Sequence, residues 1–294
     1  MNMRTYISSI VLGIILAGFY SCDKVKNPTI VSQTAVGTTF DSINNFAISG
    51  YRKTLLEDYT GHKCGNCPTA AILAASLSAQ YQSSLVVIAI HAGFFAKTDS
   101  QFPISYTCAA GQAWDGTTGS GFGVSGIGNP NGMVNRKIYP GFTLVHKDTW
   151  ATTVGLAQSD PFVVKIDLSS AYDKTAHALN VSTKLTFLQA YPNNVKLQLV
   201  LTEDSIIGAQ LDYSKNPDHV DDYEFEHMLR TAINGSWGEV AKTAPIAALT
   251  STTMANNNFS VDTKFNDRHL SLVAFVYDET TREVLQVEKI KIRK

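Results

Sequence analysis

A strand, an amphipathic helix and a buried strand follow one another in the first half of the sequence. Thr54–Tyr59 is predicted as the first strand. Cys64–Tyr81 is predicted as the helix, because apolar side chains recur from Ala70 at i, i+3, i+4, i+7 and i+11 and share one face. Leu85–Ile90 is apolar without a break, which is typical of a strand covered on both faces. This order predicts a βαβ unit with a right-handed crossover.

The segment after this unit is predicted to be irregular. Residues 97–132 are expected to form loops, since seven of the 17 positions from Gly116 to Gly132 are glycine, which disfavours regular helix. A Gly-x-Gly-x-x-Gly pattern at residues 121–126 does not indicate dinucleotide binding, because no strand directly precedes it and no helix follows it. Met133-Val134 is predicted to begin a short strand, and residues 142–157 to form a last helix.

Beyond Pro161 the hydrophobic pattern changes to a period of two, which predicts strands with one exposed face. Six strands of this kind favour an antiparallel β-sandwich. They are Phe162–Leu168, Leu179–Phe187, Val195–Leu201, Phe259–Phe265, Leu270–Tyr277 and Val284–Ile292. A helical excursion is expected at Tyr223–Asn234, and a bulge near Glu288, where the apolar phase of the last strand slips.

Residues 1–21 have the pattern of an export signal. Arg4 supplies a positive charge, and residues 7–19 form an uncharged, mostly apolar run, too short for the roughly 20 residues that a bilayer span needs. Ser21-Cys22 directly after this run resembles a bacterial lipobox. The resemblance implies that Cys22 is acylated and becomes the first residue of the mature protein. Ordinary secretion with an incidental cysteine is the alternative.

Composition and cysteine content narrow the class of protein. The net charge of −1 and the 44% of hydrophobic residues do not fit a disordered chain or a polybasic nucleic-acid-binding protein.

Three cysteines, Cys64, Cys67 and Cys108, remain after Cys22 is assigned to the lipid. Because an exported protein meets an oxidising compartment, one disulfide and one leftover thiol is the simplest interpretation. Cys108 is then expected to be a buried, small apolar residue, and a third redox thiol is the alternative.

Cys64-Gly65-Asn66-Cys67 is the pattern that carries chemistry. The pair follows a predicted strand and opens a predicted helix, where unpaired N–H groups and the helix dipole favour a thiolate. Lys63 adds a nearby positive charge. We therefore expect Cys64 to be the nucleophile and Cys67, one turn along and less accessible, to be the resolving thiol. A static disulfide is the main alternative. A zinc site is disfavoured because no second closely spaced pair accompanies the first.

At these residues the sequence resembles the thioredoxin superfamily. Asp58 precedes Cys64 by six positions, and the resemblance implies a buried acid that assists deprotonation of Cys67. Lys63 stands where the superfamily usually has Trp, which leaves the reduction potential open. His62 is expected either to tune Cys64 by hydrogen bonding or to be an exposed loop residue.

Gly128-Asn129-Pro130 before the predicted strand at Met133 resembles the cis-proline element of the same superfamily. The resemblance implies that Pro130 packs against the disulfide and that the backbone of Asn129 binds a partner peptide. Since cis X–Pro bonds are a minority form, this expectation rests on the resemblance and not on local propensity.

A more detailed resemblance connects the sequence with the family related to outer membrane protein 28, lipoproteins of Gram-negative bacteria. Glu57–Pro68 looks like the signature of this family, and Gly132–Arg136 looks like its second block. Glu226–Arg230 and Val273–Tyr277 match its C-terminal half more weakly. The resemblance implies a lipid-tethered thioredoxin-like domain followed by a β-domain, and it identifies no substrate.

The fold class expected is an α/β thioredoxin-like domain followed by an all-β, immunoglobulin-like sandwich. The expected parts are a signal peptide at 1–21, a tether at 22–45, the thioredoxin-like domain at 46–158 and the β-sandwich at 159–294. The expected function is thiol–disulfide exchange on exported proteins that carry thiols or disulfides, at the outer membrane. The alternative is a surface binding or adhesion lipoprotein with a structural disulfide. No cofactor, metal or nucleic acid is expected, and membrane contact is expected through the lipid only.

His91 and an acidic cluster in the second half of the chain are expected to have structural roles and not catalytic or metal-binding ones. His91, at the end of a predicted apolar strand, is expected to be packed and not catalytic. An acidic cluster near His219 and His227 is expected to be a solvated loop or helix start, because its spacing fits no calcium-binding loop. The cluster consists of Asp218, Asp221, Asp222, Glu224 and Glu226.

Overall fold

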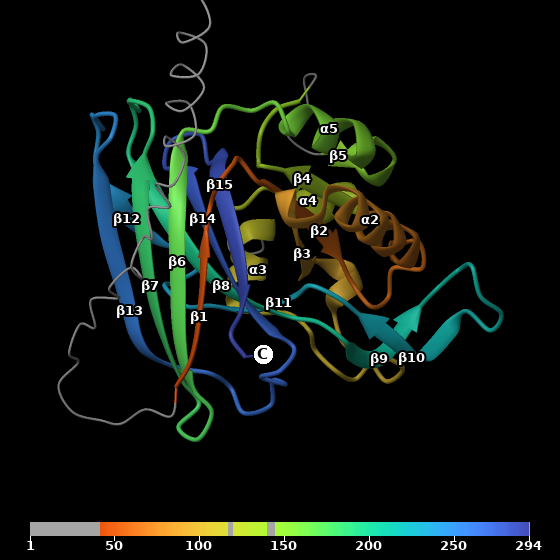
Figure 1. The fold of residues 1–294 in the computed structure, drawn as a ribbon. Helices are drawn as coiled ribbons and strands as arrows, with labels where there is room; N and C mark the ends of the chain where they lie inside the picture. Colours follow the sequence, from red (N-terminus) through yellow and green to blue (C-terminus); the bar gives the residue numbers. More distant parts are fainter. Residues whose placement is uncertain (1–41, 117–119, 140–144, 294) are drawn as a thin grey trace, which may run out of the picture. The chain divides into compact units, whose positions relative to one another are not determined.

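The computed structural model describes residues 42–116, 120–139 and 145–293, all of which belong to one compact unit (Figure 1). The predicted signal peptide, Cys22 and the predicted tether up to residue 41 lie outside the described residues. Within the described part, a mixed α/β first portion is followed by a portion that consists almost entirely of strands.

The βαβ unit is present in the order that the sequence predicts. Strand β2 (Thr54–Thr60) and strand β3 (Leu85–His91) pair in parallel, and helix α2 (Cys67–Tyr81) connects them. The helix begins three residues later than predicted. The Cys67 N–H donates a hydrogen bond to the Cys64 carbonyl, so that Cys64 lies in the turn before the helix. Pro68 occupies the first turn of the helix, where a missing N–H costs nothing.

A nine-stranded sheet has β2 and β3 near its centre. Its order is β15-β14-β8-β11-β3-β2-β4-β5, and β12 also pairs with β8. The strands not yet defined are β4 (Asn131–Val134), β5 (Val145–His146), β8 (Val195–Glu203), β11 (Met228–Ala232), β12 (Glu239–Lys242), β14 (Leu270–Asp278) and β15 (Val284–Lys291). The sheet thus contains strands from both sides of the predicted domain boundary at 158/159, and that boundary stays a prediction.

A four-stranded antiparallel sheet forms a second layer. Its order is β1-β6-β7-β13, with β1 (Ser42–Ile48), β6 (Val164–Asp173), β7 (Ala178–Phe187) and β13 (Ser251–Ser260). The buried side chains of β6 alternate with half-buried ones, as a period of two predicts. They share an apolar core with alternate residues of β8 and β14, for example Ile166 with Leu199 and Leu272.

The remaining elements are short. A hairpin forms a sheet of its own from β9 (Ile206–Leu211) and β10 (His219–Phe225) (Figure 1). The other helices are α3 (Ala109–Asp115), α4 (Val124–Ile127) and α5 (Trp150–Ala157), and single 3-10 turns lie at Gln82–Ser84, Phe94–Ala96 and Lys147–Thr149. Helices α3 and α4 lie inside the stretch predicted as loop. Of the helix predicted at 142–157, only α5 is α-helical among the described residues, and β5 and a 3-10 turn precede it.

Two predictions on the second half of the chain are wrong. The helical excursion at Tyr223–Asn234 is replaced by the end of β10 and by β11, which is a central strand of the large sheet. The strand predicted at Phe259–Phe265 lies earlier, at β13. Because β13 is an edge strand without a fully buried side chain, its Thr and Asn residues give no hydrophobic period.

The bulge predicted near Glu288 lies at Leu285. Val276 pairs with Gln286 and Tyr277 with Val284, so that one residue of β15 is skipped. Glu288 keeps regular pairing and is buried in an ion pair with Lys53. The apparent change of phase therefore arises because β15 buries polar residues, Gln286 as well as Glu288, and not because the backbone is irregular there.

Candidate functional site

Cys64 and Cys67 form a disulfide in the turn that precedes α2. The sulfur atoms are 2.04 Å apart, and the Cα atoms are 5.3 Å apart. Among the described residues, Cys108 is the cysteine outside the disulfide. Its sulfur accepts a hydrogen bond from the Gly111 N–H at the start of α3, and burial raises the pKa of the thiol.

The two cysteines of the pair are buried to the same degree. Cys64 is 2% exposed and Cys67 is 3% exposed, so the expectation that Cys64 is the more accessible of the two is wrong. The segment between β9 and β10 covers the residue that follows Cys64. A side chain added at Gly65 would meet the ring of Tyr213 at 2.5 Å, which means that this ring lies directly against the Gly65 backbone.

Hydrogen bonds fix the hairpin on this turn. The Tyr213 N–H donates to the Gly65 carbonyl at 2.9 Å, and the Leu211 N–H donates to the His62 carbonyl at 2.8 Å. The side-chain amide of Gln210 donates to the Cys64 carbonyl at 3.0 Å. Gln210 and Tyr213 are thus site residues that the sequence did not single out, since 146 positions separate Gln210 from Cys64.

Asp58 lies on β2, on the face of the sheet that α2 covers. Its side chain is 3% exposed, and its Oδ1 atom has no hydrogen-bond partner among the described residues. Burial raises the pKa of this carboxyl to about 7, because the charged form loses its hydration. The position predicted from the resemblance therefore holds a buried acid that can exist in either protonation state near neutral pH.

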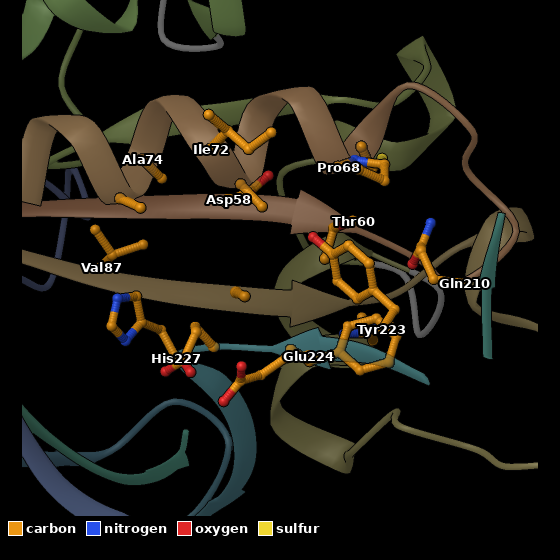
Figure 2. A pocket seen from close by; sticks show the side chains of 17 residues that line it. Asp58, Thr60, Pro68, Ile72, Ala74, Val87, Gln210, Tyr223, Glu224 and His227 are labelled. Atoms are coloured by element: carbon orange, nitrogen blue, oxygen red, sulfur yellow. The ribbon is translucent and has the colours of Figure 1, made fainter. Parts of the chain in front are cut away.

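A cavity of about 220 Å³ brings Asp58 and Cys67 together (Figure 2). The β2 and β3 strands, α2 and the hairpin strand β10 enclose it. His91 from β3 also lines it, with both ring nitrogens unpartnered among the described residues. Burial lowers the pKa of His91 to about 3, and the nearby His62 and Arg230 add to this effect. His91 is thus packed as predicted, but it is packed at the site.

The two residues expected to tune Cys64 have other partners. His62 is buried, its Nε2 atom lies 3.2 Å from the Lys97 carbonyl, and its ring stacks on Phe102 at 5.3 Å. Burial lowers the pKa of His62. The Nζ atom of Lys63 lies 3.0 Å from the carboxylate of Asp99. His62 is therefore not the exposed loop residue of the alternative, and the role of both residues in tuning stays a prediction.

The segment at Asn129 and Pro130 lies beside the βαβ unit. The Asn129–Pro130 peptide bond is cis. Asn131 follows directly and pairs with Tyr59, so that β4 runs antiparallel to β2. Pro130 is buried, while both side-chain polar atoms of Asn129 lack partners among the described residues.

The comparison with family models identifies the chain. The model of the family Outer membrane protein Omp28 matches residues 117–294, which is more than half of the sequence. The chain belongs to the Omp28 family. The CxxC pair lies outside the matched residues. The family name indicates an envelope location, and within the described residues we find no helix long and apolar enough to cross a membrane.

Two solved structures resemble this Omp28 family member in fold, and a third matches part of its sequence. HBP35 of Porphyromonas gingivalis is 15% identical with a TM-score of 0.58, and the match covers 83% of this chain and 76% of that chain. A protein from Agrobacterium tumefaciens is 10% identical with a TM-score of 0.51 and coverages of 84% and 97%. A domain of the outer membrane lipoprotein Omp28 from Porphyromonas gingivalis is 26% identical over 45% of this chain and 91% of that one, with a TM-score of 0.28. No curated protein matches significantly.

The acidic cluster of this Omp28 family member divides into two parts. Asp221 and Asp222 are exposed on β10. Asp204, Glu226 and His227 converge, with ligand-type atoms within 4.8 Å of one another. Asp204, however, already pairs with His227 at 2.8 Å and with Lys291 at 2.7 Å, and the ammonium group competes with any cation for this carboxylate.

Proposed function

We propose that this Omp28 family member exchanges disulfides with exported proteins through Cys64 and Cys67. The observation that carries the proposal is the position of the disulfide. It lies in the turn before α2, and Cys67 lines the same cavity as the unpartnered carboxyl of Asp58. A thiolate at Cys64 is favoured by the free N–H groups of the following helix turn.

In the reduced protein, the Cys64 thiolate attacks one sulfur of a partner disulfide. This step forms a mixed disulfide and releases the partner's other sulfur as a thiolate. Cys67 then transfers its proton to the Asp58 carboxylate, and its sulfur attacks Cys64. The second partner thiolate leaves, and the Cys64–Cys67 disulfide forms. Two electrons pass from the protein to the partner. The reverse steps oxidise a partner dithiol, and the relative reduction potentials decide the direction.

We also propose a thioredoxin-like first part, an immunoglobulin-like second part and a lipid anchor at the outer membrane. A thioredoxin-like first part is supported by the βαβ unit and by β4, which follows the cis Asn129–Pro130 bond and pairs with β2. An immunoglobulin-like second part is supported by the four-stranded sheet that packs on β8 and β14. Acylation of Cys22 would tether the protein to the outer membrane, and the signal-peptide pattern and the family name support this location.

A cysteine variant tests the exchange. Cys67→Ser removes the resolving thiol, so mixed disulfides between Cys64 and partners should accumulate and appear as thiol-sensitive bands in envelope extracts. Cys64→Ser/Cys67→Ser is the control and should trap none. The absence of trapped partners, together with a Cys64 thiol that stays protonated well above neutral pH, would argue against exchange.

One observation favours the alternative of a binding lipoprotein with a structural disulfide. Both cysteines are almost fully buried beneath the hairpin, which a disulfide that only fixes a turn would permit. The two functions differ in the reduced protein, because a structural disulfide is expected to leave the fold markedly less stable once it is reduced. An exchange protein must stay folded in both redox states.

A further inference from the structure

The cavity beside Cys67 has walls of two kinds. One wall includes Pro68 and Ile72 from α2, and the other includes Tyr223 from β10 (Figure 2). Phe225 from β10 also lines the cavity. Ile72 is 70% exposed, which places it at the mouth. The gap between these apolar walls suits an extended hydrocarbon chain.

Three carboxyl groups and two imidazoles line the cavity, and the imidazole of His227 already pairs with Asp204 at 2.8 Å. Among the described residues that line it, Asp58, Glu224 and Glu226 carry carboxyl groups, and none is a lysine or an arginine. Glu224 and Glu226 are exposed and lie at the mouth, whereas Asp58 is buried inside. Lys289 is near enough to interact with Glu226. Within the described part of the chain, the side chain of Glu224 has no ion-pair partner.

The interior of the cavity contains polar groups that lack partners. Oδ1 of Asp58 and both ring nitrogens of His91 are buried without a hydrogen bond to another described residue. Buried polar groups without partners are costly, and they are normally satisfied by water or by a ligand. Since one water needs about 10–15 Å³, the cavity has room for several waters or for one long side chain.

We propose that this cavity receives a lysine or arginine side chain of the partner polypeptide whose cysteine pairs with Cys64. The aliphatic stem packs between Ile72 and Tyr223, and the cationic head reaches the carboxyl groups. This inference names the partner class and rests on the proposed exchange. An acidic side chain would meet three carboxyl groups, and an apolar one would leave Asp58 and His91 without partners.

Exchange kinetics provide the first test. Peptides with one cysteine, blocked as a mixed disulfide with 2-mercaptoethanol, carry lysine, norleucine or glutamate at each neighbouring position in turn. We expect the reduced protein to react about fivefold faster with the best lysine peptide than with its norleucine counterpart, as one or two partly exposed ion pairs allow. In Glu224→Gln/Glu226→Gln this ratio should fall to about one, whereas Asp222→Asn, on the same strand but outside the cavity, should retain it.

A binding measurement makes the inference independent of exchange. N-acetyl-lysine amide is titrated into the oxidised protein while the methyl resonances of Ile72 are followed by NMR, with N-acetyl-norleucine amide as the comparison. Lysine should give a saturating shift that Glu224→Gln/Glu226→Gln abolishes and high salt weakens. An equal response to norleucine, or none to lysine, overturns the inference.

The two proposals fail in different ways. If bis(2-hydroxyethyl) disulfide, which is small and uncharged, does not react with the reduced protein, the exchange proposal is wrong, and the NMR titration still decides the cavity. If this reagent reacts but lysine peptides have no advantage, or keep it in the double glutamine variant, exchange stands and the cationic subsite is wrong.

Discussion

Asp58 and His91 are two buried titratable groups whose pKa values move in opposite directions. Burial raises the pKa of Asp58 to about 7 and lowers that of His91 to about 3, because it disfavours the charged form of each. The folded state holds the Asp58 proton where the unfolded chain has lost it, so the free energy of unfolding falls as pH rises from about 4 to 7. His91 acts in the opposite sense. Below about pH 6.5 the unfolded chain binds a proton at this histidine, whereas in the folded state His91 stays neutral. The free energy of unfolding therefore falls as the pH falls toward 3.

Single variants should separate these two effects. Asp58→Asn removes the first, so its free energy of unfolding relative to wild type should rise with pH, by up to about 4 kcal/mol between pH 4 and 8. His91→Phe removes the second, and its relative stability should rise as the solution becomes acidic. Urea unfolding of the oxidised proteins across this pH range measures both. A difference between Asp58→Asn and wild type that does not change with pH would contradict the burial argument.

Arg136 and Glu57 form a buried ion pair on the face of the sheet opposite the cavity. The guanidinium nitrogens lie 2.6–3.1 Å from the carboxylate oxygens. The Arg136 Cζ atom lies 4.9–5.6 Å from the centres of four aromatic rings, those of Trp114, Phe122, Phe275 and Tyr277. The pair therefore joins β2 to the core that both halves of the chain share.

Breaking this pair should cost more than removing it. Arg136→Met leaves the Glu57 charge buried without a partner and should lower the free energy of unfolding by about 3–5 kcal/mol. Glu57→Leu/Arg136→Met removes both charges and should cost less than Arg136→Met alone. The denaturant midpoints of Arg136→Met, Glu57→Leu and the double variant measure this. A double variant as unstable as the sum of the two single variants would show that the charges do not act as a pair.

At the scale of elements, the hairpin β9–β10 limits access to the disulfide. The ring of Tyr213 lies against Gly65, next to Cys64. Tyr213→Ala should therefore speed reduction of the disulfide by dithiothreitol, a neutral dithiol, by about tenfold, since local opening is no longer opposed by this contact. Lys215→Gln, in the same turn, is the control and should leave the rate unchanged. An unchanged rate in Tyr213→Ala would mean that another element excludes the reagent.

The same elements show what could be predicted from sequence. The βαβ unit was predictable because Leu85–Ile90 is an unbroken apolar run and α2 carries its apolar residues on one face, and both signals are local in the sequence. The hairpin was not, because its strands are short and the pairing register shifts between Val220 and Tyr223, which obscures the alternation in β10. Its contact with Cys64 joins residues far apart in the chain, and no spacing motif encodes such a contact. The hairpin that makes this contact also brings Glu224 to the cavity, so the carboxyl groups of the cavity could not be predicted from sequence either.

At the scale of the whole molecule, the proposed lipid anchor should decide where the protein is found. Cys22→Ser removes the acylation site, so the protein should move from the membrane fraction to the soluble envelope fraction. Cys108→Ser is a matched control, since it alters a cysteine that no lipid is expected to use, and it should stay with the membrane. Fractionation followed by immunoblotting measures both. Membrane association of Cys22→Ser would contradict the anchor.

The large sheet makes the two halves of the chain depend on each other. Strand β3 has β2 on one side and β11, from the second half, on the other. The apolar core around Ile88 and Ile90 includes Val200, Leu229 and Phe275. A fragment of residues 46–158 would expose this core and one edge of β3, an arrangement that favours aggregation.

We therefore expect residues 46–158 alone to show no cooperative unfolding transition by circular dichroism. Residues 42–294, which retain every described strand and both apolar layers of the large sheet, are the matched comparison and should unfold in a single transition. A cooperative transition in the short fragment would show that the βαβ unit folds without β11 and β8. The predicted boundary at 158/159 would then separate two independent domains, and the shared sheet would be a docking contact between them.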